Sequence, residues 1–112
     1  MKYLCLVYGE EAQMAEMDDA ECIACRDALI ESGHFIAGHA LQPVSTATTL
    51  RLRNGEVAIT DGPFAETKEQ LAGFYLLEAR DLNEALTKAA KIPPARIGSI
   101  EVRPVRELQA DQ

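Results

Sequence analysis

The sequence predicts an α+β fold of the ferredoxin-like, split β-α-β type, with an extra hairpin between its two halves. Three observations lead to this prediction of the order of strands and helices. Two helical patterns each begin with an Asp that has a Glu three residues later. Apolar, strand-like segments flank both helices. Asn54-Gly55 lies between two further strand-like segments, and this dipeptide is a strong hairpin signal.

Residues that start or stop regular structure set the limits of the elements. Asp18 and Asp81 are expected N-caps, and Gly33 suits the left-handed position after the first helix. Pro93-Pro94 should end the second helix. The expected elements are strand 3–8, a loop with a short helical turn over 10–17, helix 19–32, strand 35–41, hairpin strands 46–53 and 56–60, strand 73–79, a helix from 82 to about 92, and strand 99–105.

The chain is expected to form one domain over residues 1–112, because two cores would each be too small to be stable. The tail from about residue 107 is polar and should be loosely ordered. In the second strand, Phe35, Ala37, His39 and Leu41 are predicted to share one face. Leu82, Ala85, Leu86 and Ala89 should form the inner side of the second helix.

The strands Tyr3–Tyr8 and Phe74–Ala79 are apolar on both faces. Two helices can cover only one face of a four- or five-stranded sheet. An apolar sheet face left in water is improbable for a small soluble protein. We therefore expect a homodimer in which two copies pack sheet against sheet, with a pocket between the sheet and the loops at its rim.

Composition excludes several classes of function. The net charge of −7 argues against nucleic acid, which needs a basic face. No segment approaches the roughly 20 apolar residues of a membrane span, and no signal peptide precedes the first strand, so the cytoplasm is the expected compartment. The three cysteines fit a reducing compartment, and Cys22 and Cys25 share a helical face with Leu29, as core residues would.

The charged loop Thr60–Gln70 holds the densest set of reactive groups. Asp61 either caps the turn that follows it or lines a pocket as a carboxylate. His39 is either a packed residue on an apolar face or an acid–base group, because imidazole changes charge near neutral pH. If the two side chains lie close together, His39 and Asp61 would form a general acid–base pair.

Other polar groups are candidates for substrate binding. Glu66 and Lys68 form either a solvated charge run or the mouth of a pocket, where Lys68 would attract an anion. Arg103 should face away from the helices, and Phe64 is the aromatic residue of the charged loop. No metal site, phosphate cradle or nucleophile elbow is recognisable, so no cofactor or metal is expected.

Three segments resemble the YCII-related, or DGPF-domain, family, and the likeness extends over nearly the whole chain. They are Asp61-Gly62-Pro63-Phe64-Ala65-Glu66-Thr67-Lys68-Glu69, Gly73-Phe74-Tyr75 and Gly98-Ser99-Ile100-Glu101-Val102-Arg103-Pro104. Tyr8-Gly9 and Gly38-x-x-Leu41-x-Pro43 fit the same pattern.

The resemblance implies a small bacterial protein with a ferredoxin-like fold that dimerises as an α/β barrel. It also implies an active site containing an Asp and a His, here Asp61 and His39. Two functions follow as expectations. One is a cofactor-free lyase, isomerase or hydrolase acting on a small metabolite. The other is a dimeric ligand-binding or accessory module linked to sigma-factor regulation, since genes of this branch often lie beside sigma factors.

Overall fold

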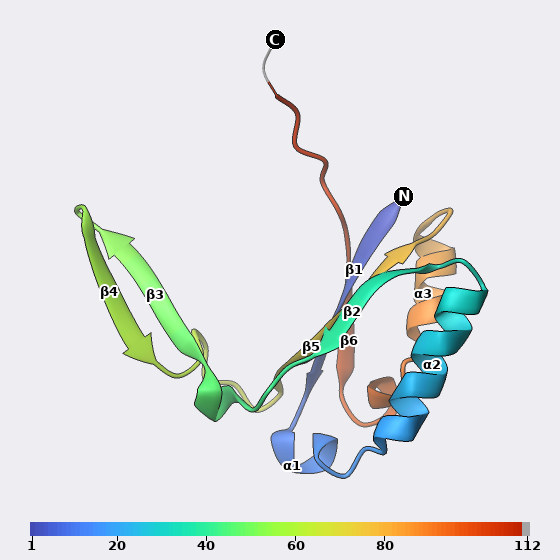
Figure 1. Cartoon of the computed structure of the whole chain (residues 1–112), viewed down its shortest axis with the longest axis horizontal. Helices are drawn as coiled ribbons and strands as arrows, with labels where there is room; N and C mark the ends of the chain where they lie inside the picture. Colours follow the sequence, from blue (N-terminus) through green and yellow to red (C-terminus); the bar gives the residue numbers. More distant parts are fainter. Residues whose placement is uncertain (111–112) are drawn as a thin grey trace.

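A computed structural model describes residues 1–110 of the chain and has an α+β architecture (Figure 1). Four strands form an antiparallel sheet in the order β2-β5-β1-β6, and β3 and β4 form a separate two-stranded sheet. The strands are β1 (Lys2–Gly9), β2 (Phe35–Ala40), β3 (Thr48–Arg53), β4 (Glu56–Asp61), β5 (Gln70–Glu78) and β6 (Ser99–Pro104). The helices are α1 (Glu11–Met14), α2 (Asp19–Glu31) and α3 (Leu82–Ala89), with short 3-10 turns at Val44–Thr46 and Pro93–Arg96.

The core lies between the sheet and the helices α2 and α3, which both lie on one side of the sheet (Figure 1). Alternate residues of β1 point to that side, among them Cys5 and Val7, and they are almost completely buried. Leu77 of β5 and Leu29 of α2 complete the central cluster. The intervening residues of β1 and β5 point to the opposite side, here called the open face, and are only half-buried.

The predicted N-caps are confirmed, but neither capping box closes on the amide of its N-cap residue, since Glu84 accepts from Arg80 N at 3.0 Å, one residue before Asp81. The carboxylate of Asp18 accepts a hydrogen bond from Ala20 N at 2.9 Å, and that of Asp81 accepts one from Glu84 N at 2.9 Å. Glu21 does not reach back to the start of its helix. It accepts two hydrogen bonds from the Arg96 guanidinium, at 2.6 and 2.8 Å, and this contact lowers the pKa of the Glu21 carboxyl.

The helix α3 ends at Ala89, about three residues earlier than the sequence predicted. Pro93 and Pro94 are buried in the following 3-10 turn, and Ile92 before them has extended backbone, as a residue preceding proline prefers. The predicted inner side of this helix was also partly wrong. Ala85 and Ala89 are buried, whereas Leu82 and Leu86 remain nearly half exposed.

A register shift in β2 corrects the predicted face of that strand. Phe35 pairs with Leu77, but Ala37 already pairs with Leu76, so Ile36 is an extra residue in the ladder. Phe35 therefore packs against the core, while Ala37 and His39 lie on the open face. Simple alternation predicted that Phe35 and His39 share one face of the strand. The one inserted residue puts their side chains on opposite faces.

The β3–β4 hairpin is confirmed, and it stands away from the rest of the protein (Figure 1). Asn54 and Gly55 have positive φ values of 52° and 77°, which a tight hairpin turn requires. Residues 105–110 continue beyond β6 without helix or strand, and residues 111–112 of the predicted loose tail lie outside the described part. None of the helices described over residues 1–110 has the length and apolar character needed to cross a membrane.

Candidate functional site

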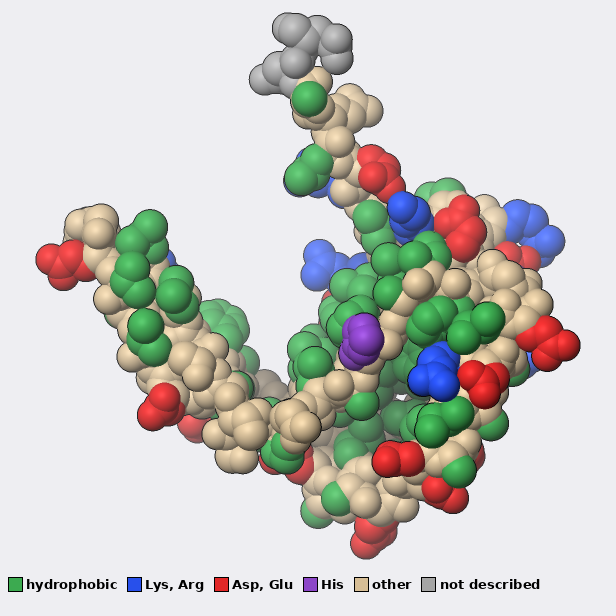
Figure 2. Space-filling view, in the orientation of Figure 1, with side chains coloured by type: hydrophobic (Ala, Val, Ile, Leu, Met, Phe, Trp, Pro, Cys, Tyr) green, Lys and Arg blue, Asp and Glu red, His purple; other side chains and the backbone are tan. Residues whose placement is uncertain are grey.

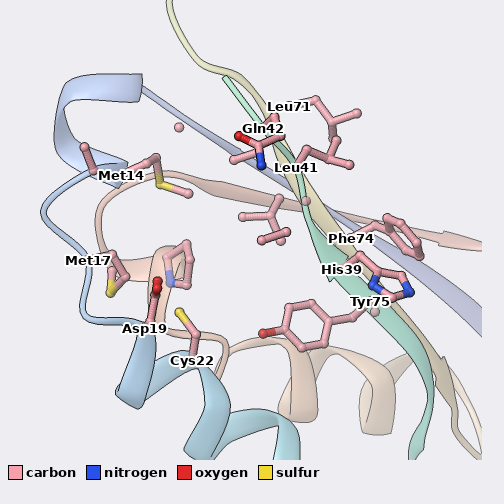
Figure 3. Close-up of a pocket in the computed structure, with 18 of the residues that line it drawn as sticks. Met14, Met17, Asp19, Cys22, His39, Leu41, Gln42, Leu71, Phe74 and Tyr75 are labelled. Atoms are coloured by element: carbon pink, nitrogen blue, oxygen red, sulfur yellow. The ribbon is translucent and has the colours of Figure 1, made fainter. Parts of the chain in front are cut away.

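A cavity of about 830 Å³ lies between the N-terminal part of α2 and the neighbouring strands β2 and β5 (Figure 3). The segment that contains α1 borders it on one side, and the loop after β2 borders it on another. The walls are mainly apolar. The side chains important here are Met14, Met17, Asp19, Cys22, Ile23, Arg26, Phe35, His39 and Tyr75.

The cavity exists because the N-terminal part of α2 does not pack tightly on the sheet. Leu29, near the end of this helix, is its only buried residue, whereas Cys22 is half-buried and Ile23 is nearly half exposed. Met14 packs over Gly9, where an added Cβ would approach its sulfur to 2.6 Å. Methionine is flexible and polarisable, so Met14 and Met17 form a wall that can adapt to different apolar shapes.

Tyr75 supplies the polar group of the cavity. Its ring packs edge-on against Phe35, with ring centroids 6.4 Å apart, and its hydroxyl points towards Cys22 and Met17 (Figure 3). Within residues 1–110 this hydroxyl has no hydrogen-bond partner. Burial, with a smaller contribution from the Cys25 and Cys22 thiols, raises the pKa of Tyr75 to about 12. The phenol is therefore neutral at physiological pH and can donate one hydrogen bond.

The raised pKa of Tyr75 predicts a loss of stability at alkaline pH. Its folded-state value lies above the ordinary value near 10, so the stabilisation is complete below pH 10 and decreases as the pH rises towards 12. Over this range we expect wild type to lose about 1 kcal/mol more than Tyr75→Phe, because partial exposure to solvent reduces the full effect. Urea unfolding of both proteins at pH 9 and 11 measures the difference. Equal losses would contradict the prediction.

The two cysteines near the cavity are protonated thiols. Burial, followed by the charge of Asp19, raises the pKa of Cys22, and burial likewise raises the pKa of Cys25. The Cys25 thiol also donates to the Lys91 carbonyl at 3.5 Å. Thiols with raised pKa are poor nucleophiles and poor metal ligands. The cysteines thus act as small apolar side chains, as the sequence suggested, although only Cys5 is fully buried.

His39 lies at the rim of the cavity, and its ring belongs to the open face of the sheet. It packs against the Phe74 ring, with centroids 5.8 Å apart. Both rings point away from the side where Tyr75, Cys22 and Met17 converge (Figure 3). The imidazole of His39 makes no hydrogen bond to any residue in the described part of the chain.

Asp61 is the last residue of β4, at the base of the hairpin. The turn after it is held by two hydrogen bonds of 2.8 Å: Gly62 N donates to the Ala47 carbonyl, and the side-chain Oγ1 of Thr49 donates to the Gly62 carbonyl. Across the described residues, no hydrogen bond or ion pair joins Asp61 to His39 within one chain. The acid–base pair therefore stays a prediction.

The predicted substrate-binding residues lie outside the cavity. Phe64 is 79% exposed, and the Arg51 guanidinium lies 5.5 Å from the centre of its ring. Lys68 pairs with Glu10 at 3.4 Å, and Arg103 pairs with Glu101 at 3.7 Å on the open face. Glu66 is exposed. The structure does not gather these side chains into one site.

The sequence reasoning missed the side chains that line the cavity. Tyr75 was included in an apolar strand, although a hydroxyl on a strand facing the core was a signal that a polar contact is needed there. Two methionines in a short segment before a helix were a weaker signal of an adaptable apolar wall. Over residues 1–110, no three His, Cys, Asp or Glu side chains are grouped as a metal site would require.

Comparison with known proteins identifies a family and a relative. The family model of the YCII-related domain matches residues 1–109. An uncharacterised protein of Rhizobium meliloti (strain 1021) is 40% identical over 114 aligned residues, which cover 94% of this chain and 92% of that protein.

Proposed function

We propose that this chain, which belongs to the YCII-related family, binds a small and mainly apolar molecule in the cavity beside Tyr75. The observation that carries this proposal is the Tyr75 hydroxyl, which points into an apolar cavity without a partner in the described chain (Figure 3). A partly buried polar group loses free energy unless something bonds to it. A ligand that accepts or donates one hydrogen bond would satisfy it.

The size and lining of the cavity support a particular class of ligand. A volume of about 830 Å³ falls in the range of roughly 300–1,000 Å³ that is common for small-molecule sites. The methionine and aromatic walls favour a flat ring system. Asp19 and Arg26 at the rim can contact polar substituents that extend towards solvent.

A homodimer with a ferredoxin-like subunit and an α/β-barrel arrangement is part of the same proposal. The strand order β2-β5-β1-β6 and the position of both helices on one side of the sheet support it. The open face, with Leu4, Leu6 and Phe74, is apolar and has no helix over it. Covering this face with a second copy of the chain would remove it from water in both copies.

An acid–base enzyme is the second candidate function. The position of His39 at the rim of the cavity favours it, because imidazole is the side chain that most readily exchanges a proton near neutral pH. In this case the protein would transfer a proton to or from the bound molecule, without a cofactor.

The test of ligand binding compares two probes that differ by one hydroxyl. We expect 1-naphthol to bind about fivefold more weakly to Tyr75→Phe than to wild type, because one hydrogen bond contributes about 1 kcal/mol. Naphthalene has no hydroxyl and should bind both proteins equally. Quenching or enhancement of probe fluorescence on titration gives the dissociation constants.

Phe35→Leu is a matched control, because it changes the apolar wall and leaves the hydroxyl in place. It should weaken the binding of both probes to a similar extent. If neither probe binds the wild-type protein, or if Tyr75→Phe weakens both probes equally, the proposed role of Tyr75 is wrong.

A further inference from the structure

The β3–β4 hairpin has one strongly apolar face. Residues that pair directly across the two strands point to the same side, so the pairs Leu50–Ile59 and Leu52–Val57 form one surface. The exposed fractions of these four side chains are 62% for Leu50, 66% for Ile59, 59% for Leu52 and 59% for Val57. An isolated two-stranded hairpin is marginally stable in water. This apolar face therefore needs a surface to pack on.

That surface is not supplied by the same chain. The hairpin and the body are separated by an open space, and hydrophobic side chains lie on the hairpin and on the part of the body beside this space (Figure 2). The radius of gyration is 16.1 Å, whereas a compact chain of this length has about 13 Å. The extra extension comes from segments that project from the body, such as the hairpin (Figure 1).

A second copy of the chain is the occupant that fits both surfaces. Each chain has an apolar hairpin face and an apolar open face. A two-fold axis would therefore create the same contact two times, with the hairpin of each copy on the open face of the other. The polar groups on the two surfaces are also complementary. The hairpin face ends in the carboxylate of Asp61, two residues after Ile59 on the same strand. The open face contains the His39 imidazole.

We propose that the hairpin of one copy covers the open face of the other, so that Asp61 of the partner subunit pairs with His39. Neither side chain has a hydrogen-bond partner within the described chain, and both would lose water when these apolar surfaces meet. A carboxylate in such an interface is stable only beside a cation or a hydrogen-bond donor. Arg103 is already engaged by Glu101. The open face therefore offers two groups: Lys2 at the start of β1, and His39 beside Phe74 on the edge strand β2. Of these, His39 lies next to an apolar ring.

The pair would provide an acid–base group that exists only in the dimer. A carboxylate beside imidazole orients the ring and favours its protonated form. Since the His39 ring lies on the open face, the partner's hairpin would form this acid–base group on the opposite side of the sheet from Tyr75. The inference rests on the homodimer of the proposed function, but not on ligand binding in the cavity.

The test is disulfide cross-linking between two variants with one introduced cysteine each, in a background in which Cys22 and Cys25 are replaced by serine and Cys5 stays buried. His39→Cys is mixed with ¹⁵N-labelled Asp61→Cys, the copies are allowed to exchange, and the mixture is oxidised. A disulfide forms readily only if the two Cβ atoms come within about 3.5–4.5 Å. We expect a mixed dimer of one labelled and one unlabelled chain, with the disulfide mapped to positions 39 and 61 by mass spectrometry.

Thr60→Cys is the matched control, because it lies next to Asp61 and on the other hairpin face. It should give little mixed product with His39→Cys. Sedimentation of the unmodified protein separates two failures. A monomer would refute both the homodimer and the pair. A dimer without the 39–61 product, or one in which Lys2→Cys cross-links to Asp61→Cys in place of His39→Cys, would refute the pair alone.

Discussion

Replacing Ile59 with aspartate is expected to weaken self-association by about 10²- to 10⁴-fold. Burial of one Ile side chain contributes about 1.5–3 kcal/mol, and a two-fold dimer contains this contact twice. The sum of about 3–6 kcal/mol corresponds to this range, since each 1.4 kcal/mol changes the dissociation constant tenfold. A charged side chain in an apolar interface adds to the loss. Sedimentation equilibrium over a range of concentrations measures the dissociation constant.

Ala58→Asp provides a control for the charge and for the hairpin itself. Ala58 precedes Ile59 and points to the other face of the same strand, opposite Arg51. Its replacement adds the same carboxylate and should leave the dissociation constant within about a few-fold of wild type. If both variants dissociate equally, the hairpin has been disrupted as a whole. If neither variant changes the dissociation constant, the apolar hairpin face is not the dimer contact.

Local sequence signals were sufficient to predict most of the elements. The N-cap residues Asp18 and Asp81 need only their own helix to act, and both hydrogen bonds are present. Asn54-Gly55 specifies its turn through its own backbone preference for positive φ. The strand boundaries of β1 and β6 differ from the prediction by a single residue at each changed end. These features depend on interactions between residues close in sequence.

The failures have a tertiary origin. Glu21 leaves its expected local contact because Arg96, 75 residues away, offers two charged hydrogen bonds. The extra residue Ile36 in β2 reflects how Phe35 packs on the core, and no local pattern in the sequence indicates it. The limits of β5 were also misjudged, since this strand begins at Gln70 within the predicted loop.

The cavity was harder to predict than any single element, because a cavity is defined by where packing is absent. The residues of α2 read as an ordinary helix, and only the fold shows that its first half stands off from β2 and β5. By contrast, the sequence did indicate an uncovered apolar sheet face. The structure adds the hairpin as the second uncovered surface and assigns Asp61 to it.

Filling the cavity with a ring from the protein itself is expected to displace a bound ligand. Cys22 points into the cavity (Figure 3), so Cys22→Phe should weaken naphthalene binding by about five- to 150-fold, the equivalent of about 1–3 kcal/mol of overpacking. The melting temperature should not fall, because the new ring would enter the cavity without displacing packed side chains.

Ala24→Phe is the control, since Ala24 is exposed on the same helix and does not line the cavity. It should bind naphthalene as wild type does. The contrast between the two variants separates a specific cavity from general adsorption to apolar surface. Adsorption to the open face or the hairpin would survive Cys22→Phe unchanged and would decrease when the dimer covers both surfaces. Loss of binding in Cys22→Phe alone, with an unchanged dimer, would locate the ligand beside Tyr75 and show that binding and self-association use different sides of the sheet.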